Sequence, residues 1–209
     1  MNNKYNRVHI DIGANDGKWA IHYARFEPKT LVIAFEPVPA LVERIKEQTS
    51  NLSNFILVDK CVSDYEGKSY LNISPESQYG DFSCSSLLSF SDKSETEWPG
   101  REDFKYIGGV EVDVIRLDKW IEENEIPYIS YLKIDTQGND LKVLKGLGER
   151  LFMVAAGNIE AGAKPDILYN GQNTKEESIQ FLEDNGFKVI DIENNDIHGN
   201  EVNIHFVKK

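Results

Sequence analysis

The sequence is poor in cysteine and has no long apolar run. Its 209 residues include two cysteines, Cys61 and Cys84, and neither lies in a spacing typical of zinc ligands. We recognise no signal peptide and no apolar stretch of about 18 residues, the length that a membrane-spanning helix needs. We therefore expect a protein of the reducing cytoplasm that has no disulfide and does not bind a membrane.

Positive charge is also scarce. The chain has 23 Lys and Arg against 35 Asp and Glu, which gives a formal net charge of −12. Nucleic acids and anionic membranes both bind through clustered Lys and Arg, and no such cluster occurs, so we expect neither partner. The length and a hydrophobic content of 40% suit one domain over residues 1–209, and no repeat or linker indicates a second.

A glycine turn lies near the start of the sequence. Residues 8–12 form a largely apolar run around Asp11, and the glycine-rich residues 13–17 lead into a segment of helical periodicity. A strand, a glycine turn and a helix typically hold a nucleotide-type cofactor, because glycine admits a ligand and the first helical amides attract an anion. The G-x-N-x-G spacing favours a small anion, such as the carboxylate of an amino-acid-like cofactor, over a pyrophosphate. The candidate cofactor-binding residues here are Asp11, Gly13, Asn15 and Gly17.

Strand and helix patterns then alternate, which predicts a parallel α/β sheet covered on both faces. The strands expected in the sheet are residues 8–12, 31–35, 55–58, 128–134, 152–159, 187–192 and 202–207. The last two are separated by turn residues and predict an antiparallel hairpin. Residues 64–116 are an insertion, with extra strands at 68–73 and 109–115 and a long polar connection at 74–109.

Acidic residues follow several of the expected strands, and ligands bind at the carboxyl edge of such sheets. Glu36 follows Gly13 by 23 positions, close to the roughly 20-residue interval at which a second-strand acid binds ribose hydroxyls. The alternative for Glu36 is a solvated loop acid. Asp135 follows the fourth strand and Glu160 the fifth, so these two carboxylates are expected on adjacent strand ends.

Several blocks of the chain resemble the FkbM-type methyltransferases, a family of the S-adenosylmethionine-dependent superfamily with a Rossmann-like core. The blocks are residues 9–17, 35–37, 85–87, 132–140 and 143–146, and the block at 132–140 is the most specific. Where many members of the family carry Glu, this chain has Gln137, which weakens any acid–base or metal role at that position.

The resemblance implies a class I methyltransferase fold, with a seven-stranded, mostly parallel sheet, and S-adenosylmethionine as the cofactor. It also implies Asp59 or Cys61 as a neighbour of the adenine. The implied reaction is methyl transfer to a hydroxyl of a sugar, a glycan or a natural-product-like small molecule. The candidate general bases are Asp135 and Glu160. The candidate acceptor contacts are Ser85 and Ser86, for which a turn with a hydrophobic anchor is the alternative.

Two other functions stay open. A nicotinamide-dependent oxidoreductase is disfavoured by the glycine spacing and by the terminal hairpin, whereas Gln137 leaves room for a cofactor-binding module without catalytic activity. Magnesium or calcium held by Asp135, Asp140 and Glu160 is conceivable, because both ions prefer oxygen ligands. The spacing alone does not establish such a site, so no metal is predicted.

Overall fold

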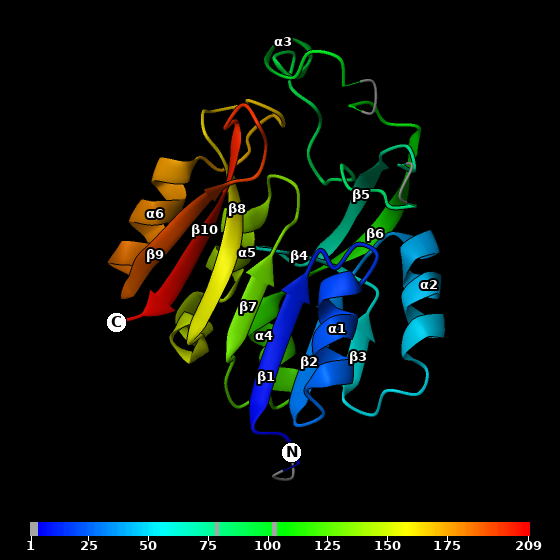
Figure 1. Ribbon diagram of the computed structural model, residues 1–209, viewed down its shortest axis with the longest axis vertical. Helices are drawn as coiled ribbons and strands as arrows, with labels where there is room; N and C mark the ends of the chain where they lie inside the picture. The colour runs from blue at the N-terminus through cyan, green and yellow to red at the C-terminus, as the bar shows by residue number, and fades with distance from the viewer. Residues whose placement is uncertain (1–3, 78–79, 102–103) are drawn as a thin grey trace.

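The computed structural model describes residues 4–77, 80–101 and 104–209, and it contains one seven-stranded sheet. The strands of this sheet are β1 (Arg7–Ile12), β2 (Thr30–Phe35), β3 (Phe55–Val58), β7 (Tyr131–Ile134), β8 (Ala156–Gly162), β9 (Phe187–Asn194) and β10 (Glu201–Lys208). They lie in the order β3-β2-β1-β7-β8-β10-β9 (Figure 1). Neighbours are parallel except at β10, which is antiparallel to β8 and β9. The mostly parallel sheet and the terminal hairpin predicted from the sequence are confirmed.

Six α-helices and one 3-10 helix lie between the strands of the described chain. They are α1 (Lys18–Phe26), α2 (Pro39–Thr49), α3 (Ser94–Glu97), α4 (Leu117–Glu123), α5 (Asp140–Gly146) and α6 (Lys175–Asp184), with a 3-10 helix, η1 (Gly148–Met153). In Figure 1, α1 lies in front of the sheet and α4 and α5 lie behind it. Within the described ranges, no helix has the length and apolar character needed to cross a membrane.

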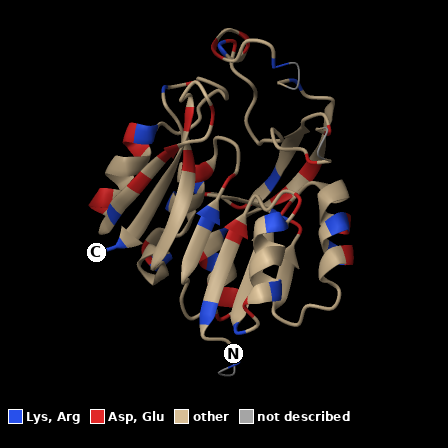
Figure 2. Cartoon of the chain, in the orientation of Figure 1, with Lys and Arg blue, Asp and Glu red and all other residues tan. Residues whose placement is uncertain are grey.

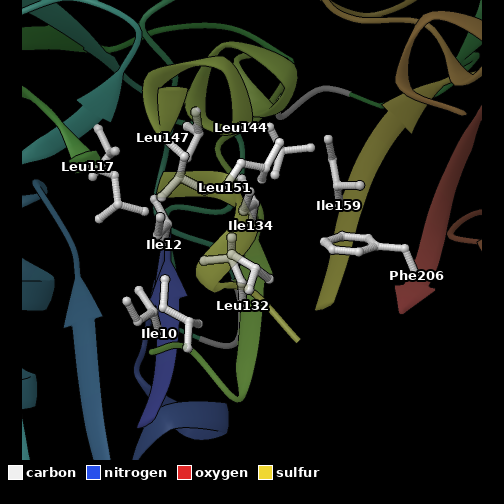
Figure 3. Close-up of a cluster of buried hydrophobic side chains, with 14 of the residues drawn as sticks. Ile10, Ile12, Leu117, Leu132, Ile134, Leu144, Leu147, Leu151, Ile159 and Phe206 are labelled. Atoms are coloured by element: carbon white, nitrogen blue, oxygen red, sulfur yellow. The ribbon is translucent and has the colours of Figure 1, made fainter. Parts of the chain in front are cut away.

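Strand β2 shows how the centre of the sheet is buried. All six of its residues are buried, as expected for a parallel strand covered on both faces. Leu31, Ile33 and Phe35 belong to the large core cluster, whereas Val32 and Ala34 pack against α1 in a smaller one. Figure 3 shows the large cluster, which includes Ile10, Ile12, Leu117, Leu132, Ile134, Leu144, Leu147, Leu151, Ile159 and Phe206.

The other half of the sheet is covered on one face, which corrects the expectation of two covered faces. Figure 1 shows no helix of the described chain in front of β7, β8, β10 and β9. The residues on this side are polar: Asn158 of β8 is in register with Lys133 of β7 and with His205 of β10. Polar side chains alternate here with apolar core residues, the pattern of strands that have one solvated face.

The region before β8 differs from the prediction of a strand at 152–159. Residues 148–153 form η1, because Leu147, Leu151 and Val154 recur at helical spacing and all three are buried in the large core cluster. As a result β8 begins at Ala156 and continues to Gly162. Glu160 therefore lies inside the strand and not after its end.

A second, three-stranded sheet consists of β4 (Cys61–Ser63), directly before the insertion, and of β5 (Gly67–Ile73) and β6 (Gly108–Arg116) within it, in the order β4-β6-β5. The two extra strands predicted in the insertion are present as β5 and β6, and they pair in antiparallel fashion. Strand β4 was not predicted, because three residues are too few to show a period in the sequence.

The long connection between β5 and β6 packs against residues 165–172. The Phe90 ring stacks on the Tyr169 ring with 5.2 Å between centroids, and the Ser91 amide donates to the Leu168 carbonyl at 2.8 Å. Ser91 Oγ also donates to the carbonyl of Asp166 at 2.6 Å. These contacts hold the connection beside the carboxyl edge of the large sheet.

Candidate functional site

A cavity opens at the carboxyl edge of the large sheet, near the ends of β1, β2 and β7. Its walls come from the glycine turn, from the segments after β2 and β7, from β4 and β5, and from residues 82–87 of the long connection. The polar residues around it are Asn15, Glu36, Lys60, Cys61, Ser83, Ser85, Ser86, Asp135, Thr136, Gln137 and Asn139. The cavity thus joins residues from position 12 to position 139 at the edge where ligands bind in α/β folds.

Gly13 is required by the crossing of two backbone segments. Its φ of +77° is in the left-handed region, and a Cβ added there would lie 1.8 Å from the carbonyl oxygen of Asp135. Gly17, also with positive φ, precedes α1, and a Cβ there would lie 3.0 Å from both Ile21 and Ile45. Gly13 lines the cavity, whereas Gly17 lies where α1 approaches α2. The close approach at Gly13 is therefore to the protein's own backbone.

Amides of the glycine turn already have protein acceptors. Those of Gly13 and Ala14 donate to the carbonyl of Phe35 at 3.0 Å, and that of Gly17 donates to the Ala14 carbonyl at 2.9 Å. These three amides are therefore occupied within the protein, whereas the expectation from the sequence concerned the first amides of the following helix. The hydrogen bonds of Gly13 and Ala14 fix the turn against the end of β2.

Glu36 is buried at the cavity wall, with an exposure of 3%. Its Oε2 accepts a hydrogen bond from the Asn15 amide at 2.7 Å, and its Oε1 accepts one from the Val38 amide at 2.8 Å. Burial raises the pKa of Glu36 to about 8, although these two amides act in the opposite direction. Each carboxylate oxygen keeps a lone pair for a hydroxyl donor in the cavity. Glu36 is not the solvated loop acid that was the alternative.

Asp11 and Lys133 form a buried ion pair beneath the turn. Lys133 Nζ lies 3.1 Å from Asp11 Oδ1 and 3.4 Å from Asp135 Oδ2. Figure 2 shows the acidic segment of β1 beside the basic segment of β7. Burial alone would lower the pKa of Lys133, but attraction to the two carboxylates outweighs it and raises this pKa. Asp11 is fully buried and outside the cavity lining, so its contact is with Lys133.

Gln137 connects the two carboxylates that were predicted as bases. Its Nε2 donates to Asp135 Oδ1 at 2.9 Å and to Glu160 Oε2 at 3.2 Å, and its Oε1 accepts from Tyr169 Oη at 2.7 Å. Asp135 lines the cavity, whereas Glu160 is buried behind Gln137, outside the lining. Burial and the neighbouring carboxylates raise the pKa of Glu160 well above its usual range. The two predicted bases are thus close together but in different environments.

Asp140 shapes the turn between β7 and α5. Its carboxylate accepts the amides of Thr136 and Gly138, both at 3.2 Å. Burial, together with repulsion from Asp135, raises its pKa to about 7. Across residues 4–77, 80–101 and 104–209, no group of three or more His, Cys, Asp or Glu residues is arranged to hold a metal ion.

The remaining predicted residues fall in different places. Cys61 lines the cavity, and burial raises the pKa of its thiol to about 12. Asp59 is exposed and lines a separate hollow between α2 and β6. Ser85 and Ser86 line the cavity but also hold its wall together. Ser85 Oγ accepts the Ser74 amide at 3.0 Å, and Ser86 Oγ donates to the Gln137 carbonyl at 2.7 Å.

Sequence reasoning missed the apolar wall of the cavity and Thr136. The apolar side consists of Ile12, Phe35, Pro37, Val38, Leu41, Val62, Leu71, Phe82 and Leu87. These positions come from several strands and loops, so no single sequence pattern connects them. Among the described residues, Asn15 Oδ1 and Thr136 Oγ1 are buried without a hydrogen-bond partner, and both residues line the cavity. A polar ligand in the cavity would supply the missing partners.

A mostly parallel sheet with a terminal antiparallel hairpin, and a cavity between a glycine turn and an acid after β2, defines the class I methyltransferase-like α/β fold. The model of the methyltransferase FkbM domain matches residues 11–189. The chain therefore belongs to the FkbM methyltransferase family.

Named relatives agree with this family. The chain is 30% identical over 149 residues to the 2-O-methyltransferase NoeI of Sinorhizobium fredii, covering 69% of this chain and 58% of that protein. It is 27% identical over 159 residues to the hexuronic acid methyltransferase AglP of Haloferax volcanii, covering 74% of this chain and 56% of that protein. The chain thus spans less than two thirds of the length of either relative.

Solved structures show the same fold. The putative methyltransferase SMU.1697c of Streptococcus mutans, solved in complex with SAH, has a TM-score of 0.52 at 12% identity. That match covers 99% of this chain and 90% of that chain. Fibrillarin of Aeropyrum pernix, with natively bound S-adenosyl-L-methionine, has a TM-score of 0.50 at 10% identity and covers 99% of this chain and 69% of that chain.

Proposed function

We propose that this chain is an S-adenosylmethionine-dependent O-methyltransferase whose acceptor is a hydroxyl group of a sugar or glycan. Family membership supports methyl transfer, and the two named relatives, a 2-O-methyltransferase and a hexuronic acid methyltransferase, support the acceptor. The observation that carries the proposal is the cavity, which has Glu36 and Asp135 in its wall and the glycine turn between them.

The cavity has the groups that the cofactor needs. Glu36 has lone pairs for the two ribose hydroxyls, and the apolar wall suits the adenine. Asn15 Oδ1 and Thr136 Oγ1 offer acceptors for the polar atoms of the methionine part. We assign cofactor contacts to Gly13, Asn15, Glu36 and Cys61. Asp11 and Gly17 support the turn from outside the lining, and the exposed Asp59 has no place in this assignment.

Asp135 is the residue best placed to act as general base. Bound S-adenosylmethionine supplies an electrophilic methyl group, and the acceptor hydroxyl must lose its proton as its oxygen takes that group. Asp135 lines the cavity, and its Oδ2 lies 3.4 Å from Lys133 Nζ. A positioned base of this kind contributes about a hundredfold or more to a rate.

Glu160 is less suited to proton abstraction. Its Oε2 accepts from Gln137, its Oε1 accepts from Asn195 Nδ2, and its raised pKa favours the protonated form. We therefore assign to Glu160 the role of holding Gln137, which in turn donates to Asp135. Ser85 and Ser86 stay candidates for acceptor contact, because both line the cavity.

The test begins with the cofactor. S-adenosylmethionine and S-adenosylhomocysteine should each raise the melting temperature, since a ligand that binds only the folded state stabilises it, and NAD should not. An acceptor screen over sugars and glycans should then show the mass gain of one methylene group. Tight binding of NAD without binding of S-adenosylhomocysteine would refute the proposal, and cofactor binding with no transfer would support a non-catalytic binding module. A cytoplasmic location stays a prediction, supported by the low cysteine content.

A further inference from the structure

We propose that Gln137 is a positioning residue that holds the carboxyl groups of Asp135 and Glu160 in a fixed orientation, and that Tyr169 supports this arrangement by donating to the oxygen of the Gln137 amide. The inference rests on the proposed function, because it concerns the base of the same reaction. It assigns to Gln137 a role that an acid at this position could not fill.

The backbone of Gln137 is held in an unusual conformation. Its φ is +56°, in the left-handed region that disfavours side chains other than glycine, and Gly138 follows with a φ of +91°. The Gln137 carbonyl accepts the hydroxyl of Ser86 at 2.7 Å. A residue kept in this conformation needs support from its surroundings, and such residues cluster at functional sites.

The hydrogen bonds of the side chain determine the orientation of its amide. The hydroxyl of Tyr169, which is fully buried, donates to Oε1 at 2.7 Å. Nε2 then directs its two hydrogens at one carboxylate oxygen of Asp135 and one of Glu160. The reversed amide would place Oε1 against the Asp135 oxygen, which cannot donate when the carboxyl is ionised, and Asp135 would lose the donor that Nε2 provides. The Tyr169 hydroxyl lies closer to Oε1, at 2.7 Å, than to the Cys84 carbonyl, at 3.4 Å, so it donates to Oε1 and supports the orientation in which Nε2 faces both carboxyl groups.

The charges around Asp135 explain why a neutral donor matters. The pKa of Asp140 and of Glu201 is raised by burial first and then by the charge of Asp135. The groups that face Asp135 are Asp11 of β1, Lys133 of β7, Asp140 of α5, Glu160 of β8 and Glu201 of β10. Among these groups Lys133 is the cation. Gln137 adds two polar hydrogens without adding a negative charge, whereas a glutamate would add a further carboxylate.

Tyr169→Phe tests the inference, with Tyr106→Phe as the matched control. Both substitutions remove a hydroxyl from the same aromatic stack around Phe90, but Tyr106 donates to the Leu88 carbonyl and not to Gln137. We expect Tyr169→Phe to raise the midpoint of the acidic limb of the single-turnover rate by about one pH unit, which is tenfold in proton affinity. The dissociation constant of S-adenosylhomocysteine should change less than about twofold, since Tyr169 is outside the cavity lining. Tyr106→Phe should leave the midpoint unchanged.

A second measurement needs no acceptor and separates this inference from the proposed function. Carbon-13 NMR titration of the Asp135 carboxyl, assigned by its loss in Asp135→Asn, should show a higher pKa in Gln137→Ala and a still higher one in Gln137→Glu. Gln180→Ala, on the exposed side of α6, is the control. Equal pKa values for Asp135 in all these proteins would overturn the inference, as would a rate loss in Tyr169→Phe that is uniform across pH. Absence of methyl transfer in the parent protein would refute only the proposed function.

Discussion

Binding of the cofactor should be linked to the loss of a proton from Glu36. The pKa of this carboxyl is about 8 in the ligand-free protein, because burial outweighs the two amides that it accepts. Ribose hydroxyls would donate two further hydrogen bonds to the ionised form and would therefore lower the pKa. We expect the affinity for S-adenosylhomocysteine to rise about tenfold between pH 6.5 and pH 8 and to level off above that range.

The same pKa has a consequence for the stability of the ligand-free protein. The folded pKa of about 8 lies above the ordinary value of 4.5, so the folded state holds the proton more tightly than the unfolded state. The contribution of Glu36 to stability is therefore fully present below pH 4.5 and is lost as the pH rises through 8. Bound cofactor should reverse part of this loss.

Glu36→Gln is the variant that isolates this effect. The side-chain oxygen of the new glutamine can accept from one of the two backbone amides. Its NH₂ group faces the other backbone amide, which then has no acceptor, and an unpaired buried N–H costs about 1–3 kcal/mol. The affinity at pH 8 should fall about ten- to hundredfold, since 1.4 kcal/mol is tenfold. The rise of affinity with pH should also shrink, although Asp140 and Glu201, with pKa values of about 7 and about 8, still titrate in this range.

Isothermal titration calorimetry in buffers of different ionisation enthalpy measures both the affinity and the number of protons released. Glu47→Gln, which removes a charge from the exposed side of α2, controls for net charge. If Glu36→Gln and the parent protein released the same number of protons on binding, Glu36 would not be the linked group and this reasoning would fail.

Three further predictions concern residues around the turn. Gly13→Ala should lower the melting temperature and cofactor affinity far more than Gly171→Ala, because both have a φ near +75° but only the Cβ at Gly13 would meet a backbone atom, at 1.8 Å. Lys133→Met should cost about 3–5 kcal/mol in urea unfolding, since it leaves buried Asp11 unpaired, and adding Asp11→Asn should recover much of that loss. Asp135→Asn should reduce the single-turnover rate by about a hundredfold or more at saturating cofactor, and an unchanged rate would exclude it as the base.

The sequence predicts the central sheet well, because its pattern there is produced by burial alone. Residues 31–35 are continuously apolar and lie in a strand buried on both faces, and residues 55–58 form β3 as predicted. The hairpin of β9 and β10 was predicted from the turn residues between the two strands. In each case the residue types that favour the local strand or turn are also the types that suit its place in the folded sheet.

The prediction failed where side chains interact over long distances in the sequence. The position of Glu160 depends on η1, which forms because Leu151 packs in the core, and a pattern of apolar residues does not separate a strand from a short helix. The role of Tyr169 depends on its contact with Gln137, 32 residues away, and no motif marks it. The sequence analysis missed the open face of β7, β8 and β10. Polar residues at alternate positions indicate that one side of a strand is exposed, but they do not show which face of the sheet the helices leave uncovered.

One contact joins the glycine turn, the proposed cofactor site, to Asp135, the proposed base. The Asp135 amide donates to the Ile12 carbonyl at 2.9 Å, and the Asp135 carbonyl lies where a Cβ of Gly13 would be. The first turn and the backbone of Asp135 are therefore packed without space for a side chain between them. Because Lys133 contacts both Asp11 and Asp135, the position of Asp135, the proposed base, relative to the glycine turn is set by the pairing of β1 with β7 and by an ion pair. A change on either strand should therefore alter cofactor affinity and turnover together, even when the changed residue is outside the cavity.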